Sequence, residues 1–246
     1  MDRSIYSAVS GMQASMIRQR AIASNLANAQ TAGFKAELFD SRAITVKGDP
    51  VEVRAMNRTE VRGANMTDGD IIATGGPLDI AMQGDTVLAV QALDGSEAYT
   101  RRGDLSITSA GVLQTGDGLP VIGDGGPVTV PVGGDVRIGP DGAILVIDPA
   151  APDAPPERIG RLKLASFAGT DIAKGLDGQF RVRGGGILPE DLEAKIIPGA
   201  IEQSNVSTSQ VMVDMIEAQR LFEIRTNIVS TNRDLDESGA RLMRLD

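Results

Sequence analysis

The sequence predicts an α+β fold in which long N- and C-terminal helices pack together, with an inserted all-β domain and a β-hairpin arm. Three observations predict it. Apolar residues recur with helical spacing at both ends of the chain, alternating residues flank a turn after the first helix, and short apolar runs separated by glycines fill the middle. The predicted boundaries are residues 1–35 for the first helical segment, 36–70 for the arm, 71–197 for the β domain and 198–246 for the second helical segment.

The C-terminal region carries the strongest helical signal, and we predict one helix over residues 207–245. This stretch contains no proline and a single glycine, and at 1.5 Å per residue it would be about 55 Å long. Ser207 and Gln210 have the spacing of a capping box, in which the hydroxyl accepts from a free N–H and the amide reaches back. Val206 and Val211 flank the start of the helix as a hydrophobic staple does.

The apolar residues of this predicted helix lie on two neighbouring faces. One face carries Val211, Met215, Ala218 and Phe222, and the other carries Leu221, Ile224, Ile228, Leu235 and Leu242. Such a stripe is too broad for a two-stranded seam and favours a helix with several neighbours. Because a single helix cannot bury this stripe on itself, we expect it to need partners.

The N-terminal region shows the same kind of periodicity over residues 4–28. Its apolar positions alternate in steps of four and three, with Gln19 as the polar interruption: Ile5, Val9, Met12, Met16, Ala23 and Leu26. Small residues flank this row, and Gly11 costs roughly 1 kcal/mol relative to alanine in a helix interior. Small residues at that cost indicate that another helix comes close, although an ordinary core-facing helix has the same periodicity.

A polar stretch ends the first predicted helix. The side chains of Asn28 and Thr31 can bond local backbone and so favour a turn over a helix. Gly33 can take the left-handed conformation that ends such a turn. From residues alone, this stretch is an elaborate helix stop.

Residues 36–70 predict an exposed arm without a core of its own. Alternating residues at 43–46 and 51–54 flank a turn-forming tetrapeptide, which is the pattern of a β-hairpin, and a third alternating piece follows at 59–62. The β domain beyond it has a turn signal after nearly every apolar run. We predict strands, in a sandwich or barrel-like arrangement, at 86–90, 112–115, 128–130, 143–147 and 161–167, with a proline-rich loop at 149–156.

Composition excludes several classes of function. The chain has 24 Lys+Arg against 33 Asp+Glu, a formal charge of −9, and only 3% aromatic residues. Nucleic-acid binding depends on basic side chains that neutralise phosphates and on aromatic side chains that stack on bases. An acidic chain with few aromatic residues supplies neither, so we do not expect nucleic-acid binding. The chain has no Cys and no His, which removes disulfides, zinc sites with those ligands, cysteine nucleophiles and Ser-His-Asp triads.

The remaining candidate sites are weak. The glycine-rich stretches at 123–126 and 184–186 lack the Lys-Ser/Thr and the helix that a phosphate loop needs, and the scattered Asp-Gly steps do not form a calcium loop. We therefore expect no catalytic, cofactor-binding or metal-binding residue, no enzymatic activity and no small-molecule substrate. A carboxylate-based hydrolase and a membrane-surface adaptor remain as rival hypotheses.

Targeting signals are also missing from the sequence. No run of eighteen apolar residues occurs, and charged and polar residues interrupt the N-terminal helix where a signal peptide would need an apolar core. We therefore expect no membrane insertion. The chain is predicted to be cytoplasmic, or to be exported by a route that needs no cleaved signal.

Three segments resemble one family. Residues 25–35 are similar to the A-N-x-x-T-x-G-F-K signature of bacterial flagellar rod and hook proteins, and residues 76–84 and 98–103 look like the start of their β domain. Residues 199–206 and 215–220 are similar to their C-terminal motif. Two departures occur: Thr86-Val87-Leu88 stands where the family often has Gly-Phe-Phe, and Leu221-Phe222-Glu223 where it often has Tyr-Glu. The residues that carry the two terminal motifs are Asn25, Asn28, Thr31, Gly33, Phe34, Lys35, Ser204, Asn205, Gln219 and Arg220.

The resemblance implies a structural subunit whose two termini form a helical inner domain that packs against copies of itself and other rod proteins. Its expected interface is the apolar row Ile5, Val9, Met12, Met16, Leu26, Val211, Met215, Phe222, Ile228 and Leu235. It also implies export by the flagellar type III apparatus and a final place in the basal body, in the periplasm. Within the family, the length and the stretch 123–127 resemble a proximal-rod subunit, with a distal-rod subunit as the alternative.

Overall fold

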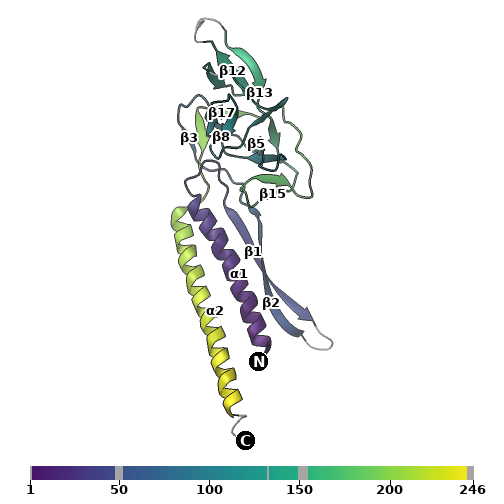
Figure 1. Ribbon diagram of the computed structural model, residues 1–246, viewed down its shortest axis with the longest axis vertical. Coiled ribbons are helices and arrows are strands. Elements are labelled where there is room, and N and C mark those ends of the chain that lie inside the picture. The colour runs from purple at the N-terminus through teal and green to yellow at the C-terminus, as the bar shows by residue number, and fades with distance from the viewer. Residues whose placement is uncertain (1, 48–51, 132, 149–154, 243–246) are drawn as a thin grey trace. The chain divides into compact units, whose positions relative to one another are not determined.

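A computed structural model describes the chain except residues 1, 48–51, 132, 149–154 and 243–246 (Figure 1). The fold is mixed, with a helix near each end and many antiparallel strands between them. The chain divides into two compact units. The helical unit comprises Met1–Ala29, Glu37–Gly63 and Val206–Asp246, and the β unit comprises Gln30–Ala36 and Ala64–Asn205.

The helical unit is built from two helices and one two-stranded sheet. Helix α1 (Asp2–Ala27) and helix α2 (Thr208–Leu242) lie side by side along most of α1 (Figure 1). Strand β1 (Glu37–Lys47) pairs with β2 (Glu52–Ala64), and α1 also contacts β1. The third alternating piece predicted at 59–62 is therefore the continuation of β2 and not a separate strand.

A small apolar core joins the two helices. Ile22, Val211 and Ala218 are buried in it, and Leu26, Phe39, Val206 and Met215 pack around them. The core lies at the end of α1 and the start of α2. Its buried α1 residue is Ile22, whereas Ala23, which the predicted apolar row contained, is exposed, so the row was predicted wrongly at this position. The two valines of the predicted staple are both members of this core.

The start of α2 shows only half of the predicted capping box. The Gln210 backbone N–H points to Ser207 Oγ at 3.5 Å, at the long limit for a hydrogen bond. The Gln210 side chain does not reach back; its Nε2 donates to Asp214 Oδ1 at 3.0 Å, one turn further along the helix. The acidic acceptor on the same face competes successfully with the backbone, so the reciprocal bond was predicted wrongly.

The β unit consists of short strands joined by tight turns. They are β3 (Ile71–Ala73), β4 (Ile80–Met82), β5 (Thr86–Gln91), β6 (Glu97–Thr100), β7 (Leu105–Ile107), β8 (Leu113–Thr115), β9 (Ile122–Gly123), β10 (Gly126–Pro127), β11 (Asp135–Ile138), β12 (Ala143–Ile147), β13 (Glu157–Arg161), β14 (Leu164–Ser166), β15 (Ile172–Lys174), β16 (Phe180–Val182), β17 (Ile196–Pro198) and β18 (Ala200–Glu202). The largest sheet has the order β14-β5-β6-β16-β15, and a three-stranded sheet has the order β11-β12-β13. The pairs β17-β4, β18-β3, β7-β8 and β10-β9 complete the unit.

Strand β5 is buried on both faces of the five-stranded sheet. Leu88 and Val90 belong to the larger apolar core, whereas Val87 and Ala89 belong to a second, smaller core. Because side chains alternate between the two faces of a strand, a strand covered on both sides has a continuous apolar sequence. This explains the unbroken run at 86–90 that predicted the strand.

Two of the predicted strands differ from the structure. Residues 128–130 form no strand, although Thr129 makes an isolated bridge with Val112. The run 161–167 is interrupted, because the backbone N–H of Leu162 bonds Gly142 O and that of Lys163 bonds Ile122 O. At this point the chain passes from the three-stranded sheet to the edge of the five-stranded sheet.

The Asp94-Gly95 step serves as a turn, whereas Asp68-Gly69 does not. Between β5 and β6, Gly95 has a φ of 80°, which only glycine adopts readily, and Asp94 Oδ1 accepts from the Ser96 N–H at 2.9 Å and from its hydroxyl at 2.6 Å. These bonds from Ser96 lower the pKa of Asp94. The carboxylate is thus engaged locally, as hairpin chemistry requires.

Candidate functional site

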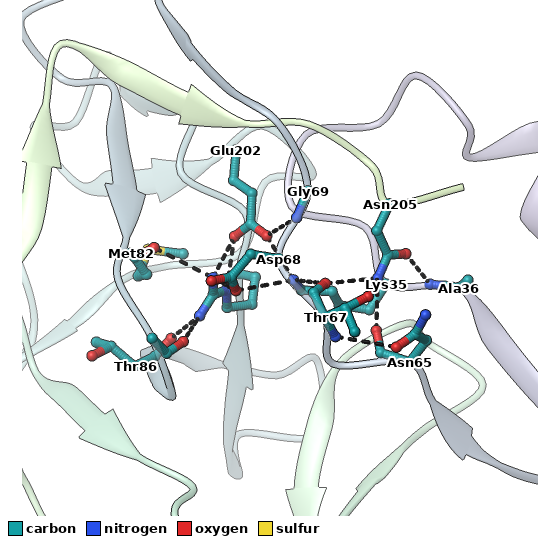
Figure 2. Close-up of polar contacts among 12 residues, drawn as sticks. Lys35, Ala36, Asn65, Thr67, Asp68, Gly69, Met82, Thr86, Glu202 and Asn205 are labelled. Atoms are coloured by element: carbon teal, nitrogen blue, oxygen red, sulfur yellow. Dashed lines mark hydrogen bonds and ion pairs between the residues drawn. The ribbon is translucent and has the colours of Figure 1, made fainter. Parts of the chain in front are cut away.

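Lys35, the last residue of the N-terminal motif, is buried in the β unit. Its side chain has no exposed area, and its ammonium donates to Glu202 Oε1 at 2.6 Å and to Thr67 O at 2.7 Å (Figure 2). Burial lowers the pKa of Lys35, and the hydrogen bond to Glu202 opposes this shift. A buried lysine of this kind needs its carboxylate partner, which lies 167 residues further along the chain.

Arg101 supplies a second buried cation to the same carboxylate. Its Nε donates to Glu202 Oε2 at 2.8 Å, and its Nη2 donates to Asp68 Oδ1 at 2.7 Å. Its other hydrogen bonds go to the backbone carbonyl oxygens of Met82, Gly84 and Thr86. Every nitrogen of the guanidinium is therefore engaged, as a buried arginine requires.

Glu202 is the centre of this arrangement. Its side chain is fully buried, and besides the two cations it accepts a hydrogen bond from the Gly69 N–H at 2.8 Å (Figure 2). We call Lys35, Asp68, Arg101 and Glu202 the charge cluster. It holds two cations and two carboxylates, and only the Asp68 side chain, 54% exposed, reaches solvent. Such a cluster stabilises a fold only while every member is present, because removal of one leaves a buried charge unpaired.

Backbone hydrogen bonds beside the charge cluster join a segment that follows α1 to a segment that precedes α2. Gly33 N donates to Glu202 O at 2.7 Å, and Asn205 N donates to Phe34 O at 3.3 Å. The Asn205 side chain then accepts from Ala36 N at 2.8 Å. Segments 33–36 and 202–205 therefore run alongside each other, and we call these segments the junction (Figure 2).

Asn205 and Gly33, one from each terminal motif, fix this junction further. The Asn205 amide nitrogen donates to the carbonyl oxygens of Asn65 and Thr67, both at 2.8 Å. Gly33 has a φ of 65°, and a Cβ there would lie 2.1 Å from the backbone oxygen of Arg101. Only glycine fits this position, which confirms the left-handed conformation expected for it.

Phe34 is held by a lysine from another strand. The Lys174 ammonium lies 3.4 Å from the centre of the Phe34 ring and donates to Lys35 O at 2.9 Å. A cation over an aromatic face contributes roughly 0.5–2 kcal/mol, depending on how far it is desolvated. This contact adds to the fixation of the N-terminal motif within the β unit.

The other N-terminal motif residues divide between the two units. In the helical unit, buried Asn25 pairs with the backbone of Glu37: its Oδ1 accepts from Glu37 N at 2.7 Å and its Nδ2 donates to Glu37 O at 3.1 Å. Asn28 Nδ2 bonds Ser24 O and so ends α1. In the β unit, Thr31 O accepts from the Phe34 N–H, which closes the predicted turn.

The C-terminal motif residues beyond the junction are less constrained. Ser204 is half-buried, and Gln219 and Arg220 are exposed on α2. Sequence reasoning missed Arg101 and Glu202 as site residues, although both lie in stretches that carry the family resemblance. Nothing in the local spacing of a charged residue shows that it is buried, so the resemblance was the only available signal.

The expected interface residues divide into a covered seam and an exposed face. Val211 is buried, and Met12, Leu26, Met215 and Phe222 are half-buried. Val9, Met16, Ile228 and Leu235 are between 42% and 59% exposed, and the side chain of Ile5 lies outside the described part of the chain. Further apolar residues on α2 that sequence reasoning did not assign to the interface are also exposed: Met212, Val213, Ile216, Leu221 and Ile224.

Polar contacts between the helices explain the small residues of α1. Arg225 Nη1 donates to Gly11 O and to Ser15 Oγ, so α2 approaches α1 here through a long polar side chain. Gln19, the polar interruption in the apolar row, points its Nε2 to Ala218 O at 3.5 Å. The helix pair is therefore held by an apolar core at one end and by polar contacts along its length.

The two glycine-rich stretches lie in turns between strands. The glycines at 184–186 all have positive φ in a turn after β16, and 123–126 form the β9–β10 turn, so neither stretch precedes a helix. Within the described ranges no three acidic side chains gather as metal ligands would. Neither helix formed by the described residues has the length and apolarity of a membrane span.

Comparison with known proteins assigns the class. Residues 5–35 match the family model described as flagella basal body rod protein, residues 81–146 the D1 domain of flagellar hook protein FlgE/F/G, and residues 197–242 the C-terminal domain of flagellar basal body rod FlgEFG protein. All three describe rod and hook proteins of the flagellum. The first match includes residues 33–35 of the junction, and the third includes residues 202–205.

Full-length relatives narrow the assignment. The chain is 39% identical to the flagellar basal-body rod protein FlgF of Salmonella typhimurium and 38% identical to that of Escherichia coli, in each case over 100% of this chain and 98% of the relative. The rod protein FlgG of Bacillus subtilis is 28% identical over 99% of this chain and 100% of its own. The chain belongs to the flagellar basal-body rod protein family and is FlgF-like.

Proposed function

We propose that this chain is a structural subunit of the proximal flagellar rod that assembles through its terminal helices with copies of itself and with other rod proteins. The observation that carries the proposal is the row of exposed apolar side chains on α2, in a chain 38–39% identical over its full length to two FlgF proteins. The lower identity to FlgG makes a distal-rod position the second choice.

Covering the exposed row in an assembly would remove apolar side chains from water. Ile216 is 66% exposed, and Ile224, Ile228 and Leu235 are 47–59% exposed. Fully burying one such side chain contributes roughly 1.5–3 kcal/mol, so covering the exposed half of each is expected to add about 1 kcal/mol. Several such contacts along one helix would hold a neighbouring subunit while leaving the free chain folded.

The other expected features belong to the same proposal. The helical segments at the two ends are the inner, packed part of the rod, and the β1–β2 pair is an arm that reaches neighbouring subunits. The subunit transmits torque through packed helices and has no catalytic activity. It is exported through the flagellar type III apparatus without a cleaved signal and ends in the basal body, in the periplasm.

Charge substitutions on the exposed row test the proposal. The variant Ile228→Asp/Leu235→Asp should leave the free chain as helical and as soluble as the parent, because neither residue belongs to the described core of the helix pair. In cells whose own copy of the gene is deleted, this variant should not enter the basal body and should not restore swimming. The matched control is Leu93→Asp, which changes a 96% exposed leucine of the β unit and should restore both.

Two results would overturn the proposal. Normal incorporation of the double variant would show that the exposed row is not covered in the rod. Equal failure of Leu93→Asp and the double variant would show that any added charge blocks assembly, and the row would then have no special role.

A further inference from the structure

We propose that Glu202 is the residue that completes the β unit, so that this unit cannot close until the segment directly before α2 is in place. The observation is the charge cluster: Lys35 and Arg101 are buried, and Glu202 is the buried carboxylate that both of them bond. The inference concerns the folding of a single chain and is independent of what the folded chain assembles with.

Without Glu202, burying the two cations would cost free energy that no other residue of the charge cluster offsets in full. Lys35 has no exposed side-chain area and Arg101 only 1%. The other carboxylate, Asp68, bonds Arg101 at 2.7 Å but stays 3.7 Å from Lys35, and it is half exposed. One partly hydrated carboxylate cannot compensate two buried cations, so the native arrangement is strongly disfavoured without Glu202.

The second step is the position of Glu202 in the chain. Lys35 and Arg101 precede it by 167 and 101 residues, and it ends β18, the last strand of the β unit. The same residue also bonds the Gly33 N–H through its backbone oxygen and the Gly69 N–H through its side chain. Lys35 and Arg101 therefore lack their shared buried carboxylate until Glu202 is in place.

The consequence is an order of folding. A chain that becomes available from its N-terminus holds both cations and all earlier strands before it holds the carboxylate. Its β unit stays open until residues 199–205 are present, and α2 begins directly after them, at Thr208.

The first test uses the full chain with Glu202→Gln, which keeps the size of the side chain and removes its charge. We expect the hydrogen-exchange protection of the β5 and β6 amides, far from the substitution in sequence, to fall on the order of 100-fold or more. The control Glu193→Gln neutralises an exposed glutamate of the same unit and should leave protection unchanged. Protection of the Glu202→Gln variant within a few-fold of the parent would overturn the proposal.

A compensating variant keeps the test decisive if Glu202→Gln fails to fold. Lys35→Met/Glu202→Gln removes one cation together with the carboxylate and leaves Arg101 with Asp68, so part of the lost protection should return. If the double variant is no better protected than Glu202→Gln alone, charge compensation is not the cause and the proposal fails.

The second test follows the order of events in the refolding full chain. Pulse-labelling by hydrogen exchange should show β5 and β6 gaining stable protection in the same kinetic phase as the β18 amides. Stable protection of β5 and β6 in an earlier phase than β18 would show that the unit closes without Glu202, and would contradict the proposal.

Discussion

Gly11 offers a direct test of how α1 and α2 approach each other. A glycine in the middle of a helix costs about 1 kcal/mol relative to alanine. A Cβ added at Gly11 would lie 3.5 Å from Arg225 Nε and 3.7 Å from its Cδ and Cζ, which are ordinary contacts with a long side chain. Gly11→Ala should therefore stabilise α1 in the free chain by about 1 kcal/mol, with no clash to offset the gain.

Hydrogen exchange of the α1 amides in the free chain measures this effect. Protection should rise roughly fivefold in Gly11→Ala, since about 1 kcal/mol changes an equilibrium by that factor. The matched control is Ala23→Gly at an exposed position of α1, which should lower protection by a similar factor. A loss of protection in Gly11→Ala would refute the reasoning, because it would mean that the α2 backbone lies closer to Gly11 than the structure shows.

Three further predictions concern stability. Ile22→Ala removes the buried centre of the helix-pair core and should destabilise the two helices by about 2–4 kcal/mol, measured by thermal loss of their helicity. Gly33→Ala places a Cβ against the Arg101 backbone and should lower the stability of the β unit by at least about 2 kcal/mol in urea unfolding. Burial, with a hydrogen bond to a glutamate, raises the pKa of Tyr99 above its usual 10.0. Above pH 10 the unfolded chain loses the phenolic proton that the folded chain keeps. The contribution of Tyr99 to stability is therefore intact below pH 10 and falls as the pH rises above it. In a Tyr6→Phe chain, phenolate absorbance should appear only together with unfolding, and its appearance near pH 10 in folded protein would disprove this.

The elements of the fold with a strong local pattern could be predicted from the sequence. The helix expected at 4–28 is observed as Asp2–Ala27, and the strand expected at 86–90 as Thr86–Gln91. Both have an apolar period that one element imposes by itself. The run at 161–167 was predicted wrongly, because its break at Leu162 depends on a hydrogen bond to Gly142, which local sequence does not reveal.

The candidate site was only partly predictable for a similar reason. The left-handed conformation of Gly33 was predicted from the local turn pattern, whereas Asn205 was found because it lies in a motif of a known family. The partnership of Lys35 with Glu202 joins residues 167 positions apart, and the spacing of charges along the chain gives no sign of it. Periodicity located most of the apolar residues of both helices but chose Ala23 in place of the buried Ile22. It could not show which residues the other helix covers, because that depends on the packing of the pair.

The central claim is that the exposed face of α2 is covered when the subunit is in the rod. The chain has no cysteine, so Ile228→Cys introduces a single thiol at a position that is 48% exposed in the free chain. Its rate of reaction with a maleimide should be high in the free chain and low in isolated basal bodies, while Ala218→Cys, 2% exposed, should react slowly in both. An Ile228→Cys thiol that reacts equally fast in basal bodies and in the free chain would contradict the account.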